Sequence, residues 1–188
     1  MVLDKYSYLK EELLRCIDSV VAIEGISGSP CDELREKIQN NVFNLIVLGQ
    51  FKRGKTSLIN ALLGAEILPT AVVPLTSIAT ILKYGETLNI KVYFNDGRVI
   101  EIEPAGLPDY VTEKGNPKNI KDVLEVIITY LSPYLKDRVR LIDTPGVGSV
   151  YEHNTDVAYR YLPKSDAVLF LLSVDQPVSK EGSIFSRM

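Results

Sequence analysis

Residues 49–56 read Gly49-Gln50-Phe51-Lys52-Arg53-Gly54-Lys55-Thr56 and fit the phosphate-binding pattern G-x-x-x-x-G-K-[S/T]. Its two glycines let the backbone wrap tightly, so that successive N–H groups point inward at phosphate oxygens. An apolar run over residues 43–48 precedes the stretch and predicts a buried strand. The residues that follow predict a helix over 55–63, which Gly64 ends. A strand before and a helix after are the surroundings in which this pattern forms a phosphate-binding loop.

The loop residues have predicted tasks in binding a nucleotide. Lys55 would reach the β- and γ-phosphates, and the Thr56 hydroxyl would ligate Mg²⁺. The following helix would direct its positive N-terminus at the same anion. The predicted nucleotide-binding residues of the loop are Gly49, Gln50, Phe51, Lys52, Arg53, Gly54, Lys55, Thr56 and Ser57.

A second motif, Asp143-Thr144-Pro145-Gly146, follows the apolar run Val139–Ile142. An aspartate at the end of a strand, downstream of a phosphate-binding loop, can hold Mg²⁺ through water. The glycine three residues later can offer its N–H to the γ-phosphate. Asp143 is therefore a predicted metal residue and Gly146 a predicted phosphate contact, and the pair favours a GTPase over an ATPase or other nucleotide-binding folds of this type.

The segment between the two motifs should contain a threonine that closes on Mg²⁺ when a γ-phosphate is present. Thr70, Thr76 and Thr80 are the candidates, and spacing alone does not choose among them.

The pattern of the whole chain predicts an α/β fold of the P-loop NTPase type, with a mostly parallel sheet, an inserted β-hairpin and an N-terminal helical hairpin. Residues 1–40 form the predicted hairpin and residues 41–188 the nucleotide-binding part. In the first helix an apolar seam repeats every three or four residues. The seam comprises Tyr6, Leu9, Leu13, Cys16, Val20 and Ile23. Ser29 and Pro30 restart a second helix.

The predicted strands beyond the loop cover residues 78–84, 88–94, 98–103, 123–130, 139–142 and 167–172. Asn95-Asp96-Gly97 predicts a tight turn between the second and third of these. Residues 116–121 are predicted to start a helix. Residues 155–162 are predicted to form a second helix.

Composition narrows the class of protein. A net charge of -3 and a pI near 5.3 argue against binding nucleic acid, which needs a clustered basic surface. No apolar run approaches the roughly 20 residues that span a bilayer, and the start lacks the pattern of a signal peptide. Cys16 and Cys31 are predicted to be reduced, buried thiols of a cytoplasmic protein.

The chain resembles the bacterial dynamin-like proteins, members of the dynamin family of GTPases. The resemblance rests on LGQFKRGKTSLINALLG at 48–64, ILPTAVVPLTSIATILKYG at 67–85, VRLIDTPGVGS at 139–149 and SDAVLFLLSVDQPVS at 165–179. It implies a GTPase that binds GTP or GDP with Mg²⁺, forms a homodimer or higher oligomer across its nucleotide face, and remodels or tethers membranes. It also points to Thr76 as the switch threonine, acting in catalysis and on the metal.

The resemblance carries further expectations. The helical start resembles the neck helix of the family, and its seam would pack against helices from elsewhere in the protein or leave an exposed stripe. The Asn/Thr-Lys-x-Asp motif that recognises guanine is absent, so the chain is expected to be a part of the GTPase domain that stops before it. Lipid would be contacted by regions beyond this chain, as in a peripheral membrane protein.

Lys52 and Arg53 occupy the part of the loop from which the resemblance implies that members of the family supply catalytic charge. Val147 occupies the place of the water-positioning glutamine of Ras-like GTPases, so catalysis cannot use that side chain. Lys52 replaces a serine common in the family, at a slot where guanylate-binding relatives place an arginine. The hypothesis is that Lys52 or Arg53 supplies positive charge to the transition state.

Two alternatives stay open at this point. One is a translation-associated or ribosome-associated GTPase, which the long hairpin region between the two motifs disfavours. The other is an assembly module that lacks catalytic activity. His153, which has no cysteine near it in sequence, is predicted to be a surface residue rather than a metal ligand.

Overall fold

The structure is a computed structural model that describes residues 2–23, 28–50, 52–70, 77–146 and 152–172, with the backbone alone at 2–4, 28–29 and 152–155. The chain divides into two compact units, Met1–Phe43 and Asn44–Met188.

The first unit is a helical hairpin of α1 (Val2–Val21) and α2 (Gly28–Gln39). Ile17 is buried between the two helices, with 8% of its surface exposed. Lys10 Nζ donates to Gln39 O at 2.8 Å and to Asn41 Oδ1 at 2.7 Å, and thereby places a cation at the C-terminal end of α2. Asp18 and Arg35 form an ion pair across the hairpin.

The predicted seam of α1 does not face α2. Its members are all exposed, and Leu13 and Ile23 show 53% and 56% of their surface to solvent. The prediction that both cysteines are buried is wrong: Cys16 is exposed and Cys31 is half-buried. Cys16 is exposed because it lies on the seam, whereas the face with Ile17 packs against α2.

The second unit is built on a seven-stranded sheet of order β4-β3-β5-β2-β6-β1-β7. The parallel pairs include β1 with β7 and β2 with β5, and β2 with β6, β3 with β4 and β3 with β5 are antiparallel. The strands are β1 (Phe43–Gly49), β2 (Thr80–Tyr84), β3 (Asn89–Phe94), β4 (Val99–Ile102), β5 (Val123–Tyr130), β6 (Val139–Asp143) and β7 (Ala167–Leu171). The predicted α/β fold with an inserted hairpin is confirmed.

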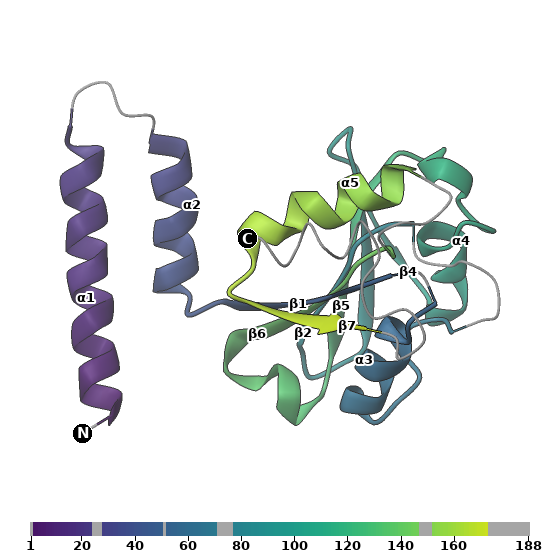
Figure 1. The fold of residues 1–188 in the computed structure, drawn as a ribbon, viewed down its shortest axis with the longest axis horizontal. Helices are drawn as coiled ribbons and strands as arrows, with labels where there is room; N and C mark the ends of the chain where they lie inside the picture. The colour runs from purple at the N-terminus through teal and green to yellow at the C-terminus, as the bar shows by residue number, and fades with distance from the viewer. Residues whose placement is uncertain (1, 24–27, 51, 71–76, 147–151, 173–188) are drawn as a thin grey trace. The chain divides into compact units, whose positions relative to one another are not determined.

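Helices cover both faces of this sheet (Figure 1). On one face α5 (Glu152–Tyr161) packs Ala158 and Tyr161 against β1, β2 and β6. On the other, α3 (Lys55–Leu63) and α4 (Pro108–Val111) pack against the larger core. Short 3₁₀ turns complete the unit: η1 (Pro104–Gly106), η2 (Pro117–Asn119), η3 (Pro133–Arg138) and η4 (Leu162–Lys164).

The helix predicted to start at Asn116 does not form. The segment contains the single turn η2, and Lys118 and Asn119 have left-handed φ angles of 49° and 56°. An α-helix is incompatible with two successive left-handed residues. Asparagine side chains here hydrogen-bond to the backbone and compete with helical bonds.

Tyr161 connects α5 to the sheet. Its hydroxyl donates to the carboxylate of Glu125 on β5, and the tyrosine is 5% exposed. Burial raises the pKa of Tyr161, and the Glu125 carboxylate raises that pKa further.

We expect Tyr161→Phe to lower the free energy of unfolding by about 2 kcal/mol at neutral pH, because a hydrogen bond to a charged group contributes roughly 1.5–3 kcal/mol. The folded-state pKa of Tyr161 lies above its usual value of 10.0. The tyrosine's contribution should therefore be full below pH 10 and be lost as the pH rises further. Urea unfolding of both proteins at a series of pH values measures the difference. Tyr134→Phe, at a tyrosine that is 60% exposed, is the control and should show neither effect.

Candidate functional site

The site lies where β1 and β6, neighbours in the sheet, end. The Thr56 hydroxyl, in the first turn of α3, donates to Asp143 Oδ2 at 3.0 Å. Thr144, which is fully buried, donates its hydroxyl to Val47 O on β1 at 2.9 Å. The two strand ends are therefore tied together, and the two sequence motifs meet although 87 residues separate Thr56 from Asp143.

The loop from β1 to α3 has the shape of an anion cradle. Lys52 and Gly54 adopt left-handed φ angles of 57° and 79°. Gly49 has a φ of 151°, and a Cβ there would lie 2.7 Å from Leu171 O on β7, so this position requires glycine. The first turn of α3 has no side-chain cap, so its N–H groups are available to an anion.

Lys55 is buried in this cradle, with 7% of its surface exposed. Its Nζ donates to Gly49 O at 2.9 Å and to Gln50 O at 3.0 Å. Burial lowers the pKa of Lys55, while the charge of Asp143 acts in the opposite direction. A buried cation held by neutral carbonyls beside one carboxylate is suited to an anionic ligand.

The two other cations of the loop differ in setting. Lys52 is exposed. Arg53 is half-buried, its Nη2 lies 3.4 Å from Gln50 Oε1, and within the described part of the chain its buried Nε has no hydrogen-bond partner. An arginine with an unused donor beside the cradle can serve an oxygen of a bound phosphate.

The oxygen atoms of Thr56 and Asp143 fit a magnesium ion, which prefers hard oxygen ligands. Across the described ranges no cluster of three or more His, Cys, Asp or Glu side chains could hold a metal. Phosphate oxygens and water would therefore have to supply the other ligands, as is usual for Mg²⁺ at nucleotides.

The structure describes two of the three candidate switch threonines, Thr80 and Thr70, and their settings differ. Thr80 is 1% exposed, and in the β2–β6 pairing its Cα lies opposite that of Asp143, so it is a threonine of the sheet. Thr70 is exposed on the loop after α3. Thr76, Phe51, Val147 and the His153 side chain lie outside the described residues, whereas Gly146 is described and buried.

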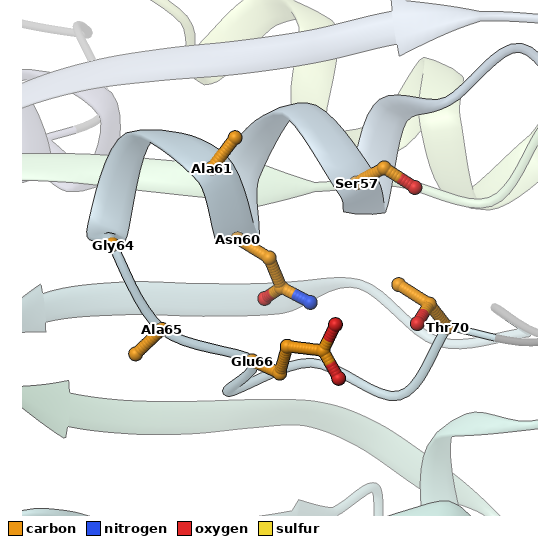
Figure 2. Close-up of a pocket in the computed structure, with 7 residues that line it drawn as sticks. All are labelled: Ser57, Asn60, Ala61, Gly64, Ala65, Glu66 and Thr70. Carbon is orange, nitrogen blue, oxygen red and sulfur yellow. The ribbon is translucent and has the colours of Figure 1, made fainter.

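A pocket of about 350 Å³ lies along α3 and the loop that follows this helix (Figure 2). Figure 2 shows Asn60 directed from α3 toward the loop that carries Glu66 and Thr70. Asn60 donates its amide to Leu68 O at 2.8 Å and accepts from Leu68 N at 2.9 Å, and so holds this loop against α3. Ser57, a predicted nucleotide contact, lines the same pocket.

Sequence reasoning gave no role to Asn60, Thr144 or the buried Ser77. Each supports the site through a hydrogen bond to the backbone. Thr144 lies within the motif Asp143-Thr144-Pro145-Gly146, and its place in that motif is the sequence feature that could have indicated a role.

Comparison with known proteins assigns the family. Residues 45–187 match the model of the dynamin family. The chain belongs to the dynamin family. Its resemblance to bacterial dynamin-like proteins is therefore confirmed.

Two relatives illustrate the extent of the match. An uncharacterised protein from the xynA 3′ region of Caldicellulosiruptor sp. is 50% identical over 159 residues, which are 85% of this chain and 39% of that protein. The bacterial dynamin-like protein of Nostoc punctiforme is 30% identical over 154 residues, 76% of this chain and 22% of that protein. The chain thus spans between about a fifth and two fifths of the length of these relatives.

Solved structures share the fold. One, from work on an oligomerised bacterial dynamin pair in the long-range sensing and tethering of membranes, superposes with a TM-score of 0.67 at 24% identity. The alignment covers 94% of this chain and 28% of that one. Among the described helices of this family member, none combines the length and hydropathy needed to cross a bilayer.

The burial of Lys55 predicts a pH dependence of stability. Because the folded-state pKa of Lys55 is lowered from 10.5, the unfolded state binds more protons between the two values. The free energy of unfolding of the wild type, relative to Lys55→Met, should therefore rise as the pH increases toward 10.5. Urea unfolding without nucleotide measures this difference. Lys91→Met, at an exposed lysine of β3, should show no such trend, and a flat difference for Lys55 would contradict the prediction.

Proposed function

We propose that this chain binds GTP and GDP with Mg²⁺ and contributes to GTP hydrolysis in a dynamin-like GTPase. The observation that carries the proposal is the convergence of Lys55, Thr56 and Asp143 at the ends of β1 and β6, with Thr56 Oγ1 3.0 Å from Asp143 Oδ2. A buried lysine, a hydroxyl and a carboxylate at an uncapped helix start match the needs of a nucleotide phosphate and its metal.

The residues of the chain divide the work as follows. The backbone N–H groups of the cradle bind the phosphates, and Lys55 exchanges its carbonyl partners Gly49 and Gln50 for phosphate oxygens. Thr56 and Asp143 would hold a bound Mg²⁺, and Gly146 would offer its N–H to the γ-phosphate. A bound Mg²⁺ would neutralise charge on the phosphates. Thr76, which lies outside the described residues, is the proposed switch threonine, whose hydroxyl would act on the metal.

The wider role follows from the relatives. We propose that the protein forms a homodimer or higher oligomer and acts at a membrane surface as a cytoplasmic, peripheral protein. The solved structure of a tethering bacterial dynamin pair supports this proposal. The exposed seam of α1 supports assembly as well, because exposed apolar stripes favour association.

Calorimetric titration tests nucleotide binding. GTP, GDP and ATP are titrated into this chain with Mg²⁺, beside Lys55→Ala. We expect binding that weakens roughly 10–100-fold in the variant, since hydrogen bonds to charged groups contribute about 1.5–3 kcal/mol. Equal affinity for GTP and ATP would place recognition of the base outside this chain. Absence of binding would leave an assembly module as the function of this chain.

Turnover measurements test the two loop cations. When GTP hydrolysis by this protein is assayed, Lys52→Ala or Arg53→Ala should lower kcat by about tenfold or more. GDP affinity should change little, because charge that acts on the transition state affects kcat. Lys91→Ala, at an exposed lysine of β3 outside the site, is the control and should leave kcat unchanged. If both loop variants keep the wild-type kcat, neither cation supplies this charge.

A further inference from the structure

Thr144 is the first residue after β6, at the point where the chain leaves the sheet. The strand ends at Asp143, and Pro145 has no N–H with which a ladder of hydrogen bonds could continue. A side chain makes the link instead, because the Thr144 hydroxyl donates to Val47 O on β1 at 2.9 Å. Thr144 and Val47 are both fully buried, so water does not compete for this bond.

Asp143 is thereby placed between two neighbouring strands. On one side β6 pairs with β2, where the Cα of Asp143 lies opposite that of Thr80. On the other side β6 is the neighbour of β1, the strand that leads into the phosphate-binding loop. The Thr144 bond extends the contact with β1 one residue past the end of β6. It is therefore the link that relates the position of Asp143 to the start of the loop.

The separation of Asp143 and Thr56 depends on this placement. The Thr56 hydroxyl lies 3.0 Å from Asp143 Oδ2, and the two residues belong to different elements, α3 and β6. Mg²⁺ requires near-octahedral geometry with ligands at about 2.0–2.1 Å. Binding groups have to be held within about 0.5 Å of the productive geometry, so a small displacement of β6 against β1 would weaken a metal site here.

Lys55 makes comparable bonds that nucleotide binding would break. Its Nζ donates to Gly49 O and Gln50 O, at the end of β1. In the proposed function Lys55 exchanges these carbonyls for phosphate oxygens, and the end of β1 then loses two side-chain bonds. The partner of Thr144, Val47, lies inside β1 before the loop begins, so the Thr144 bond remains. The nucleotide-bound form consequently depends on Thr144 more than the empty form does.

We propose that Thr144 is a positioning residue for Asp143 and Thr56, and that it thereby couples Mg²⁺ binding to nucleotide binding. Its hydroxyl is committed to Val47 O in the core, so Thr144 acts through Asp143 and not by contact with the nucleotide. The bond holds the end of β6 against β1, so that the oxygens of Asp143 and Thr56 face the same ion. The inference rests on the proposed function, because it concerns the metal that accompanies a nucleotide at that site.

The test measures the affinity of the full chain for GTPγS by calorimetry, once with Mg²⁺ and once with EDTA. Thr144→Val removes the hydroxyl at nearly constant volume. We expect the ratio of the two affinities to fall by about fivefold or more, since coupling between two bound ligands is typically about 5–150-fold. The affinity in EDTA should stay within about twofold of the wild-type value. Thr144→Ser keeps the hydroxyl and should keep the wild-type ratio.

Thr112→Val provides the matched control. Thr112 is 4% exposed, and its hydroxyl donates to Pro108 O at 2.7 Å, so the variant loses a bond of the same kind away from β1 and β6. It should lower the unfolding temperature without changing the affinity ratio. If Thr144→Val does not fold, Thr144→Cys and Thr144→Ser decide. These two side chains are similar in size, but a thiol is a weak donor, so the cysteine variant alone should lower the ratio.

Two results would overturn the inference, and both differ from failure of the proposed function. A wild-type ratio in folded Thr144→Val, or in Thr144→Cys where the valine variant does not fold, would show that the bond is merely structural. Lys55-dependent binding of GTPγS by the wild type, equally tight with Mg²⁺ and with EDTA, would leave nucleotide binding standing and remove the coupling. If the wild type binds no nucleotide, the proposed function itself fails, and the inference fails with it.

Discussion

The hydrogen bond between the Thr56 hydroxyl and the Asp143 carboxylate is the constraint around which the second unit is arranged. It requires β1 and β6 to be neighbours and to end together, and it requires α3 to begin where the loop finishes its turn. The hydrogen bond from the Thr144 hydroxyl to Val47 O also holds β6 against β1 at this junction. The entropic cost of bringing distant segments together grows only slowly with their separation, so a sequence separation of 87 positions is tolerated. The burial of Lys55 is the cost of this arrangement, and such costs are typical of binding sites.

Much of the fold could be predicted because local patterns agree with the tertiary structure. The bounds of α3 follow from the loop glycine and Gly64, and the β-branched run Val123–Tyr130 is β5 as predicted. The errors have a common cause. Whether Asn116 begins a helix, and whether Cys16 is buried, depends on contacts with residues distant in sequence: Asn116 bonds to Tyr110 and Lys121, and Cys16 lies on the face of α1 that α2 does not cover.

The candidate site shows the same division. Lys55, Thr56 and Asp143 could be predicted because their spacing within two motifs is tied to phosphate and metal chemistry. Asn60 and Ser77 could not, because asparagine and serine are common, and their importance comes from the backbone atoms that they meet. Spacing alone could not decide whether Thr80 is the switch threonine. The structure shows that Thr80 belongs to β2 and pairs with Asp143, so it is a residue of the sheet.

The length of the turn between Gly115 and β5 determines the register of β5 in the sheet. Asn119 grips Val123 at both backbone atoms, and β5 then runs in register with β2, with Val126 and Ile128 fully buried. An extra residue in this turn would either release that grip or slide β5 by one position. A slide would turn the buried side chains of β5 outward, because side chains alternate between the faces of a sheet. The length of this turn is therefore more tightly constrained than the identity of its exposed residues.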